Sequence, residues 1–162
     1  MINEQNVIAH YNKNNLYKKI EDGLLELGVS LDAVCREDLN LVDDFHIGGS
    51  AATHFILENL SCDQNHSILD IGCGIGGPAR YFATEFGCRV TGIDITPEYI
   101  NVARLLSEKV GLSDRLQFDC GDATSLPYSD GYFDMVWALN VTMNIEDRST
   151  LYSEINRVLI PG

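Results

Sequence analysis

SILDIGCGIGGPARYF, residues 67–82, is the stretch that decides the predicted fold of this chain. A short apolar run leads into Asp70, and Pro78 later opens a helical pattern, so the order predicts a strand, a tight loop and a helix. Four glycines form the loop: Gly72, Gly74, Gly76 and Gly77. Glycines let backbone N–H groups approach a ligand closely, and a helix start adds unpaired donors and a partial positive charge. We therefore expect a small ligand on this loop.

Downstream of the loop, segments with strand character alternate with segments of helical periodicity. The expected strands are residues 68–71, 89–93, 116–120 and 133–139. The expected helices are residues 78–86, 96–110 and 147–160, with Thr96 as the N-cap of the second. Strands buried on both faces between helices are typical of an α/β protein with a doubly wound parallel sheet, which is the predicted fold class.

Residues 1–66 are expected to form a helical extension or lid in front of a ligand-binding domain that runs from 67 to 162. Helical spacing of apolar residues predicts helices over 15–27, 30–39 and 51–60, the second capped by Ser30. At the other end, the last helix runs into a proline–glycine turn, which normally delivers the chain into another strand. Because strand four would also be an open edge, we expect a chain truncated after strand four rather than a natural minimal domain.

The composition limits the expected partners. The 162 residues carry 11 lysines and arginines against 24 aspartates and glutamates, a net charge of −13, so a nucleic-acid partner is not expected. No apolar run approaches the roughly 18 residues of a membrane span, and the polar N-terminus lacks the pattern of a signal peptide. The five cysteines and four histidines show no disulfide-framework or zinc-ligand spacing. We expect a cytoplasmic protein with reduced cysteines and no metal.

Two nucleotide ligands fit the glycine loop. Gly72, Gly74 and Gly77 satisfy the Gly-x-Gly-x-x-Gly spacing of dinucleotide-binding folds, and Asp94 lies about where an acid binds the ribose. Asp70 argues against a dinucleotide, because a carboxylate there would repel a pyrophosphate by roughly 1 to 4 kcal/mol at about 4 Å. The same carboxylate favours a ligand with an ammonium or sulfonium group. S-adenosylmethionine carries both and has no phosphate.

Several residues can bind the nucleoside of such a ligand. Asp94 can accept hydrogen bonds from both ribose hydroxyls, and Asp122 can accept one from the adenine amino group. The backbone of Ala123 can pair with a ring nitrogen, and Ile95 can lie against the adenine face. The acids follow successive strands, at whose carboxyl ends open sheets bind ligands. We interpret Asp134, just before strand four, as structural.

Four segments, taken together, resemble class I S-adenosylmethionine-dependent methyltransferases: ILDIGCGIGG, VTGIDITPEYI, CGDATSLPYSDGYFDMVWALN and EINRVLIPG. In order and spacing they are similar to the motifs that run from the first strand of that family to the approach to its fifth. The resemblance covers about residues 68–162 and implies a Rossmann-like sheet of seven strands, of which this chain supplies four. Upstream, DDFHIGGSAAT resembles the lead-in helix of small-molecule methyltransferases, such as those acting on sarcosine and dimethylglycine, phosphoethanolamine or tocopherols.

The resemblance implies methyl transfer from S-adenosylmethionine to a small-molecule nucleophile of the amine, phenol or quinol type. It places the methionine end of the cofactor against Asp70, Gly72 and Gly74. Cys73 of the same loop is counted among the expected cofactor-binding residues, as a small filler, and Asn140 is nearby. Residues 139–144 depart from the family, since LNVTMN replaces the more usual run containing His or Glu.

The resemblance also points to a lid. His46 and Gly49 are candidates to cover the cofactor carboxylate or the substrate, and His46 titrates near neutrality and could act as the catalytic base. Met143 and Tyr11 are candidates to line the substrate pocket. Two other functions stay open at this point: an NAD(P)-dependent oxidoreductase, and a cofactor-binding fragment without activity.

Overall fold

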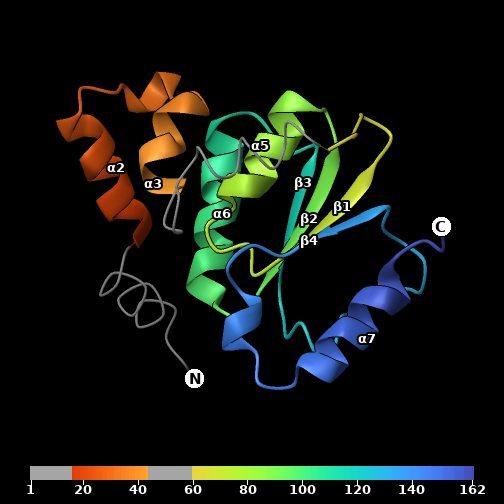
Figure 1. Cartoon of the computed structure of the whole chain (residues 1–162). Coiled ribbons are helices and arrows are strands. Elements are labelled where there is room, and N and C mark those ends of the chain that lie inside the picture. The colour runs from red at the N-terminus through yellow and green to blue at the C-terminus, as the bar shows by residue number, and fades with distance from the viewer. Residues whose placement is uncertain (1–15, 44–59) are drawn as a thin grey trace, which may run out of the picture. The chain divides into compact units, whose positions relative to one another are not determined.

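The computed structural model of this chain describes residues 16–43 and 60–162. Its centre is a four-stranded parallel sheet with the strand order β3-β2-β1-β4 (Figure 1). The strands are β1 (Ser67–Ile71), β2 (Arg89–Asp94), β3 (Leu116–Cys120) and β4 (Met135–Trp137). The order reverses between β1 and β4, because β2 and β3 extend the sheet to one side and β4 to the other. In open sheets of this kind, ligands bind outside the carboxyl ends of the strands at the reversal.

Helices cover both faces of the sheet (Figure 1). They are α5 (Gly77–Glu85), α6 (Pro97–Lys109) and α7 (Arg148–Val158). Side chains alternate along β1, so Ile68 enters the core beneath α5 and α6 with Phe82, whereas Leu69 enters the core beneath α7 with Leu151. Burial of the strands on both faces explains their nearly continuous apolar runs. The predicted doubly wound parallel sheet is confirmed.

Strand β4 is shorter than the expected 133–139. Phe133 forms an isolated parallel bridge with Leu159, just after α7, and the Asp134 carboxylate accepts a hydrogen bond from the Ser67 N–H at 2.8 Å. The pairing of β4 with β1 ends at Trp137, because β1 then turns into the glycine loop. The prediction of a strand over 133–139 was therefore too long. The interpretation of Asp134 as structural is confirmed.

The helix ends follow the sequence with one exception. Pro97 begins α6, and Asp147 caps α7 by accepting a hydrogen bond from the Thr150 N–H at 3.0 Å. Thr96 stands at the N-cap of α6, as predicted, but its side chain makes no capping hydrogen bond. Its N–H donates instead to Asp94 Oδ1 at 2.8 Å. An aspartate commonly bonds the backbone two residues on, and here that local turn replaces the hydroxyl cap.

The arginine of EINRVLIPG ties α7 to the loop between β3 and β4. Arg157 pairs with Glu154 at 2.7 Å and with Asp130 at 2.8 Å. It also donates to the carbonyl groups of Tyr128 at 2.7 Å and Leu126 at 3.0 Å. Residues 121–132 form no helix or strand, and these contacts satisfy part of their backbone. This segment of the family pattern therefore has a structural role.

The chain divides into two compact units, Met1–Val34 and Cys35–Gly162. In the first unit, α2 (Leu16–Glu26) buries an apolar stripe and ends before Gly28, whose φ of 81° suits a helix stop. The predicted first helix and its glycine stop are confirmed. None of the helices in the described parts of the chain is long and apolar enough to cross a membrane.

The single helix expected over 30–39 was wrong. Three short pieces stand there and just beyond: η1 (Leu31–Ala33), η2 (Glu37–Leu39) and α3 (Asn40–Asp43). Ser30 makes no side-chain cap, Val34 is extended, and the Cys35 N–H donates to Asp38 Oδ2 at 2.9 Å, which starts a new turn. The helix expected over 51–60 lies almost entirely outside the described residues, and the boundary at residue 66 stays a prediction.

Candidate cofactor site

The glycine loop is tied to the end of β2. The N–H groups of Gly72 and Cys73 both donate to the Ile93 carbonyl, at 2.8 and 3.1 Å. One carboxylate oxygen of Asp94 accepts a hydrogen bond from the Gly74 N–H at 3.0 Å. The other accepts one from the Thr96 N–H at the start of α6. The acid predicted to bind a ribose therefore also holds the loop in shape. Spacing alone could not show this second role.

Two glycines of the loop have different surroundings. Both Gly72 (φ 69°) and Gly74 (φ 54°) adopt a left-handed backbone that favours glycine. A Cβ on Gly72 would lie 2.3 Å from Val141 Cγ2, so the segment after β4 packs directly on this residue. A Cβ on Gly74 would meet no heavy atom within 4 Å. Gly72 thus serves packing, and Gly74 faces open space, as expected for a glycine that a ligand approaches.

A buried ion pair lies behind the loop. Arg80 on α5 is fully buried and pairs with both carboxylate oxygens of Asp43, the last residue of α3. Its guanidinium also donates to the Ile75 carbonyl in the loop at 2.8 Å and to Ser107 Oγ on α6 at 3.3 Å. A Cβ on Gly77 would lie 2.7 Å from Asp43 Cβ, which explains that glycine. One side chain therefore joins the loop to three helices, and no sequence pattern had pointed to it.

Asp70 stands near the end of β1 with only 2% of its surface exposed. Its Oδ2 atom is buried and has no hydrogen-bond partner among the described residues. Burial, and secondarily the Asp94 carboxylate, raise the pKa of Asp70 to about 8. Leaving a buried polar group unpaired costs on the order of 1–3 kcal/mol, and such groups are rare in native proteins. The unpaired oxygen therefore marks a place where a ligand's N–H group would be stabilised.

The positions predicted for adenosine lie on the same edge of the sheet. The Gly121 N–H, just after β3, donates to the Asp94 carbonyl at 3.0 Å and joins the ends of the two strands. Asp122 is exposed and accepts from the backbone N–H two residues on, which lowers its pKa. Ala123 is half-buried. Ile95 is 72% exposed, an unusual position for an isoleucine, and offers an apolar surface to a flat ring.

The segment after β4 borders the glycine loop. Asn140 has φ 54° and is the one non-glycine residue in the described parts of the chain with a positive φ. That conformation costs roughly 1–2 kcal/mol and is best tolerated by asparagine and aspartate. The next residue, Val141, makes the contact with Gly72, and η3 (Thr142–Asn144) follows with Met143 exposed. The strained residue thus lies at the reversal of strand order, but its contact with a cofactor stays a prediction.

The residues predicted for a lid or substrate pocket in the N-terminal part, His46, Gly49 and Tyr11, lie outside the described residues. Their roles stay predictions. In residues 16–43 and 60–162, no cluster of three or more His, Cys, Asp or Glu side chains could hold a metal ion. The five cysteines are free thiols.

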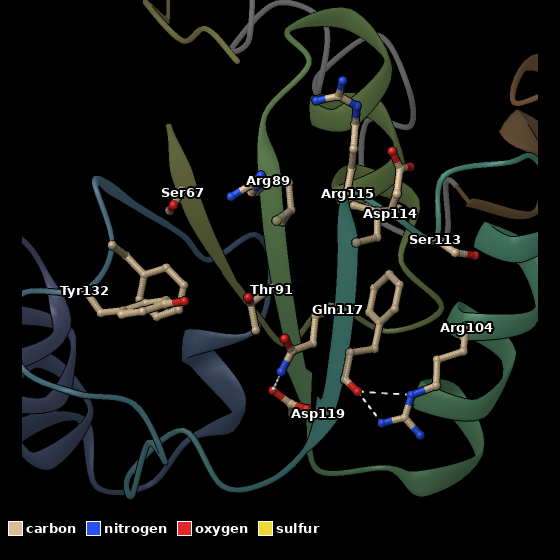
Figure 2. A pocket seen from close by; sticks show the side chains of 14 residues that line it. Ser67, Arg89, Thr91, Arg104, Ser113, Asp114, Arg115, Gln117, Asp119 and Tyr132 are labelled. Carbon is tan, nitrogen blue, oxygen red and sulfur yellow. Dashed lines mark hydrogen bonds between the residues drawn. The ribbon is translucent and has the colours of Figure 1, made fainter. Parts of the chain in front are cut away.

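A cavity of about 560 Å³ lies along β2 and β3 (Figure 2). Its lining includes Arg89, Thr91, Arg115 and Gln117, and Gln117 donates to the Asp119 carboxylate at 2.9 Å. None of the predicted cofactor residues lines this cavity. It begins at the amino ends of the strands and lacks a glycine loop, so we place the candidate site at the carboxyl edge instead.

Comparison with known proteins tests the family to which the four sequence segments pointed. Residues 69–162, more than half of the chain, match a family described as "Methyltransferase domain". The chain belongs to the class I S-adenosylmethionine-dependent methyltransferases. The matched residues contain the glycine loop and all three acids of the candidate site, as the sequence resemblance predicted.

Two curated relatives illustrate the similarity. This methyltransferase-family chain is 40% identical over 109 residues to sterol 24-C-methyltransferase ERG6B of Gibberella zeae, covering 67% of the chain and 29% of that protein. It is 40% identical over 96 residues to a probable chloroplastic tocopherol O-methyltransferase of Oryza sativa subsp. japonica, covering 59% of the chain and 26% of that protein. The chain spans less than half the length of the curated relatives it matches.

A solved structure is similar as well. The [4+2]-cyclase SpnF superposes with a TM-score of 0.67 at 35% identity, covering 74% of this methyltransferase-family chain and 45% of that chain. The Rossmann-like methyltransferase fold is therefore confirmed by a neighbour of related sequence.

Family membership decides between the two nucleotides that fit the loop, because S-adenosylmethionine is the cofactor of this family. The residues present fit that molecule. The unpaired Asp70 oxygen suits its ammonium group, Gly74 leaves open space at the loop, and the exposed Ile95 suits its adenine.

Proposed function

We propose that the protein containing this chain transfers a methyl group from S-adenosylmethionine to a small-molecule nucleophile of the amine, phenol or quinol type. The single observation that carries the proposal is Asp70. A buried carboxyl at the end of the first strand lies beside a glycine loop within the family match, and its Oδ2 atom, which has no partner among the described residues, can accept an N–H hydrogen bond from a ligand. S-adenosylmethionine offers that partner in its ammonium group.

The residues proposed to hold the cofactor follow from its chemistry. Asp70 would accept a hydrogen bond from the ammonium group, and Gly74 would leave room for the methionine chain. Asp94 would accept from the ribose hydroxyls while keeping the loop in shape. At the other end, Asp122 and the Ala123 backbone would meet the adenine edge. Ile95 loses exposed apolar surface if the ring covers it, which adds a favourable contribution to binding.

The sulfonium of the bound cofactor supplies an already activated methyl group, so this chain has to align the partners and exclude water. Asn140 and Val141 border the methionine end in this proposal, and the exposed Met143 is free to contact an apolar acceptor. A base is needed only for an acceptor that arrives protonated. We keep His46 as the candidate for that role.

The relatives support a small molecule as the acceptor, and one of them supports the phenol type. Their names give a sterol carbon and a tocopherol oxygen as methylated positions, both on apolar small molecules. The name of SpnF gives a cyclisation, so a shared domain does not by itself guarantee methyl transfer. An acidic chain with a net charge of −13 also suits a small-molecule acceptor better than a nucleic acid. Five free thiols are consistent with a reducing compartment, and we propose the cytoplasm.

The test uses the protein with labelled methyl donor. S-adenosylmethionine carrying a tritiated methyl group is incubated with a panel of amines, phenols, quinols and sterols, and label in the extracted product is counted. In parallel, calorimetry measures binding of S-adenosylhomocysteine and of NAD. The proposal expects S-adenosylhomocysteine to bind, NAD not to bind, and an amine, phenol or quinol to be labelled. Binding of NAD alone would overturn it, and labelling of the sterols alone would overturn the proposed type of acceptor.

A further inference from the structure

The buried Asp70 carboxyl raises a question that cofactor binding alone does not answer, namely where its proton goes. Isolated charges are strongly disfavoured in a protein interior unless they are paired. Asp70 is 2% exposed, its Oδ2 has no partner among the described residues, and no positively charged group is among those that influence it. With only the described residues around it and no ligand bound, the stable form of this side chain is therefore the neutral acid.

Among the described residues, the groups that surround Asp70 cannot neutralise a carboxylate. At the end of β2, the carboxylate of Asp94 contributes negative charge. In the loop after β1, the thiol of Cys73 is neutral, because burial raises its pKa far above the usual range. On β4, Trp137 stands opposite Asp70 in register and carries no charge.

The one cation near the loop on α5 is already engaged. Arg80 pairs with Asp43 and donates to the Ile75 carbonyl and Ser107 Oγ. It influences Cys73 but is not among the groups that shift Asp70. A cation for Asp70 must therefore come from outside the described residues, and the ammonium group of the cofactor is the candidate.

We infer that cofactor binding at this site is coupled to the release of one proton from Asp70. This inference rests on the proposed function and deepens it. The O–H bond of the carboxylic acid breaks, the proton passes to the buffer, and the resulting carboxylate accepts an N–H hydrogen bond from the ammonium group. Charge is balanced within the site, because the ligand brings the positive charge that the protein lacks there.

The coupling makes affinity depend on pH in a defined direction. With a pKa raised to about 8, the empty protein holds the proton at neutral pH. Each pH unit gained below that value removes part of the cost of deprotonation, so affinity for S-adenosylhomocysteine should rise about tenfold per unit between pH 6 and 7.5. Above pH 8 the rise should end, first because Asp70 is already ionised and then because the ligand amine loses its own proton.

A matched ligand and matched variants isolate the effect. Methylthioadenosine keeps the adenosine and sulfur but lacks the amino-acid end, so its binding should release no proton and should not change with pH. Asp70→Asn removes the titrating group. Asp114→Asn removes an exposed carboxylate outside the proposed site and controls for the change in net charge.

Calorimetry at pH 7 in phosphate and in Tris, whose ionisation enthalpies differ, counts the protons released. The inference expects close to one proton per S-adenosylhomocysteine bound by the wild-type protein and by Asp114→Asn. It expects none for Asp70→Asn, and none for methylthioadenosine on any protein. Binding of S-adenosylhomocysteine to the wild-type protein without proton release would overturn the inference and leave the proposed function standing. Failure of S-adenosylhomocysteine to bind at all would instead overturn the proposed function. The wild-type comparison of the two ligands decides the matter even if Asp70→Asn does not fold.

Discussion

Replacing Gly72 and Gly74 separately by alanine tests the structure of the glycine loop. Both residues have a positive φ, so either alanine costs roughly 1–2 kcal/mol in backbone strain. Only Gly72→Ala also places a methyl group 2.3 Å from Val141 Cγ2. Overpacking of this kind typically costs about 1–3 kcal/mol. We therefore expect a loss of roughly 2–5 kcal/mol for Gly72→Ala and roughly 1–2 kcal/mol for Gly74→Ala.

Urea unfolding measures both losses, and thermal melts check them. For a chain of 162 residues, 1 kcal/mol corresponds to roughly 2–4 °C in Tm. Affinity should respond in the opposite order. Gly74→Ala fills the open space at the loop and should weaken S-adenosylhomocysteine binding about tenfold or more, equivalent to about 1.4 kcal/mol.

Val141→Ala supplies the control, because it removes the atoms that the new methyl group would meet. The double variant Gly72→Ala/Val141→Ala should lose less stability than the sum of the single variants, with a coupling of about 1–3 kcal/mol. Equal destabilisation by the two glycine substitutions, or strict additivity of Gly72→Ala with Val141→Ala, would refute the packing of the segment after β4 on the loop.

Three further predictions concern the charged groups around the loop. Between about pH 4 and 8 the native state holds a proton on Asp70 that the unfolded state lacks, so the free energy of unfolding falls as pH rises. Asp70→Asn should abolish this fall and should stabilise the ligand-free protein by up to about 4 kcal/mol at pH 7. Thermal melts across pH 5–8.5 measure both effects. Arg80→Met removes the buried guanidinium that pairs with Asp43 and should cost about 3–5 kcal/mol in urea unfolding. Asp94→Asn should weaken S-adenosylhomocysteine binding about 10- to 100-fold in calorimetry, since hydrogen bonds to a charged group contribute roughly 1.5–3 kcal/mol.

Each of these predictions has a result that contradicts it. A pH dependence of stability unchanged by Asp70→Asn would mean that another group holds the proton. The double variant Arg80→Met/Asp43→Leu should recover stability relative to Arg80→Met, and no recovery would argue against the ion pair. An unchanged affinity of Asp94→Asn for S-adenosylhomocysteine would contradict the proposed hydrogen bonds between Asp94 and the ribose hydroxyls.

The alternation of strands and helices could be predicted because burial on both faces and glycine or proline at helix ends leave local signals. The ends of β4 could not be predicted, because they depend on contacts with distant segments. Phe133 bridges to the residue after α7, and the Asp134 carboxylate accepts a hydrogen bond from the Ser67 N–H. The helix expected over 30–39 failed for a similar reason. Apolar spacing was compatible with one helix, whereas the backbone N–H of Cys35 found a side-chain acceptor in Asp38 and broke it.

The candidate site likewise has features that sequence could predict and features that it could not. Its acids were found because each one lies near or just after the end of a predicted strand, and parallel strands bring their carboxyl ends together. Sequence could not show that Asp94 holds the loop, that Gly72 and Gly74 have different surroundings, or that Asp70 is unpaired. Those properties depend on which atoms surround each residue in three dimensions. Arg80 left no signal at all, because a lone arginine in a helical pattern usually lies on the surface.

A crystal structure of the protein bound to S-adenosylhomocysteine tests the central claim most directly. The account predicts the ligand at the carboxyl edge of the sheet, with its ammonium group on the Asp70 carboxylate, its ribose hydroxyls on Asp94 and its adenine against Ile95. Electron density for the ligand in the cavity along β2 and β3, or at the glycine loop with Asp70 still unpaired, would contradict the account.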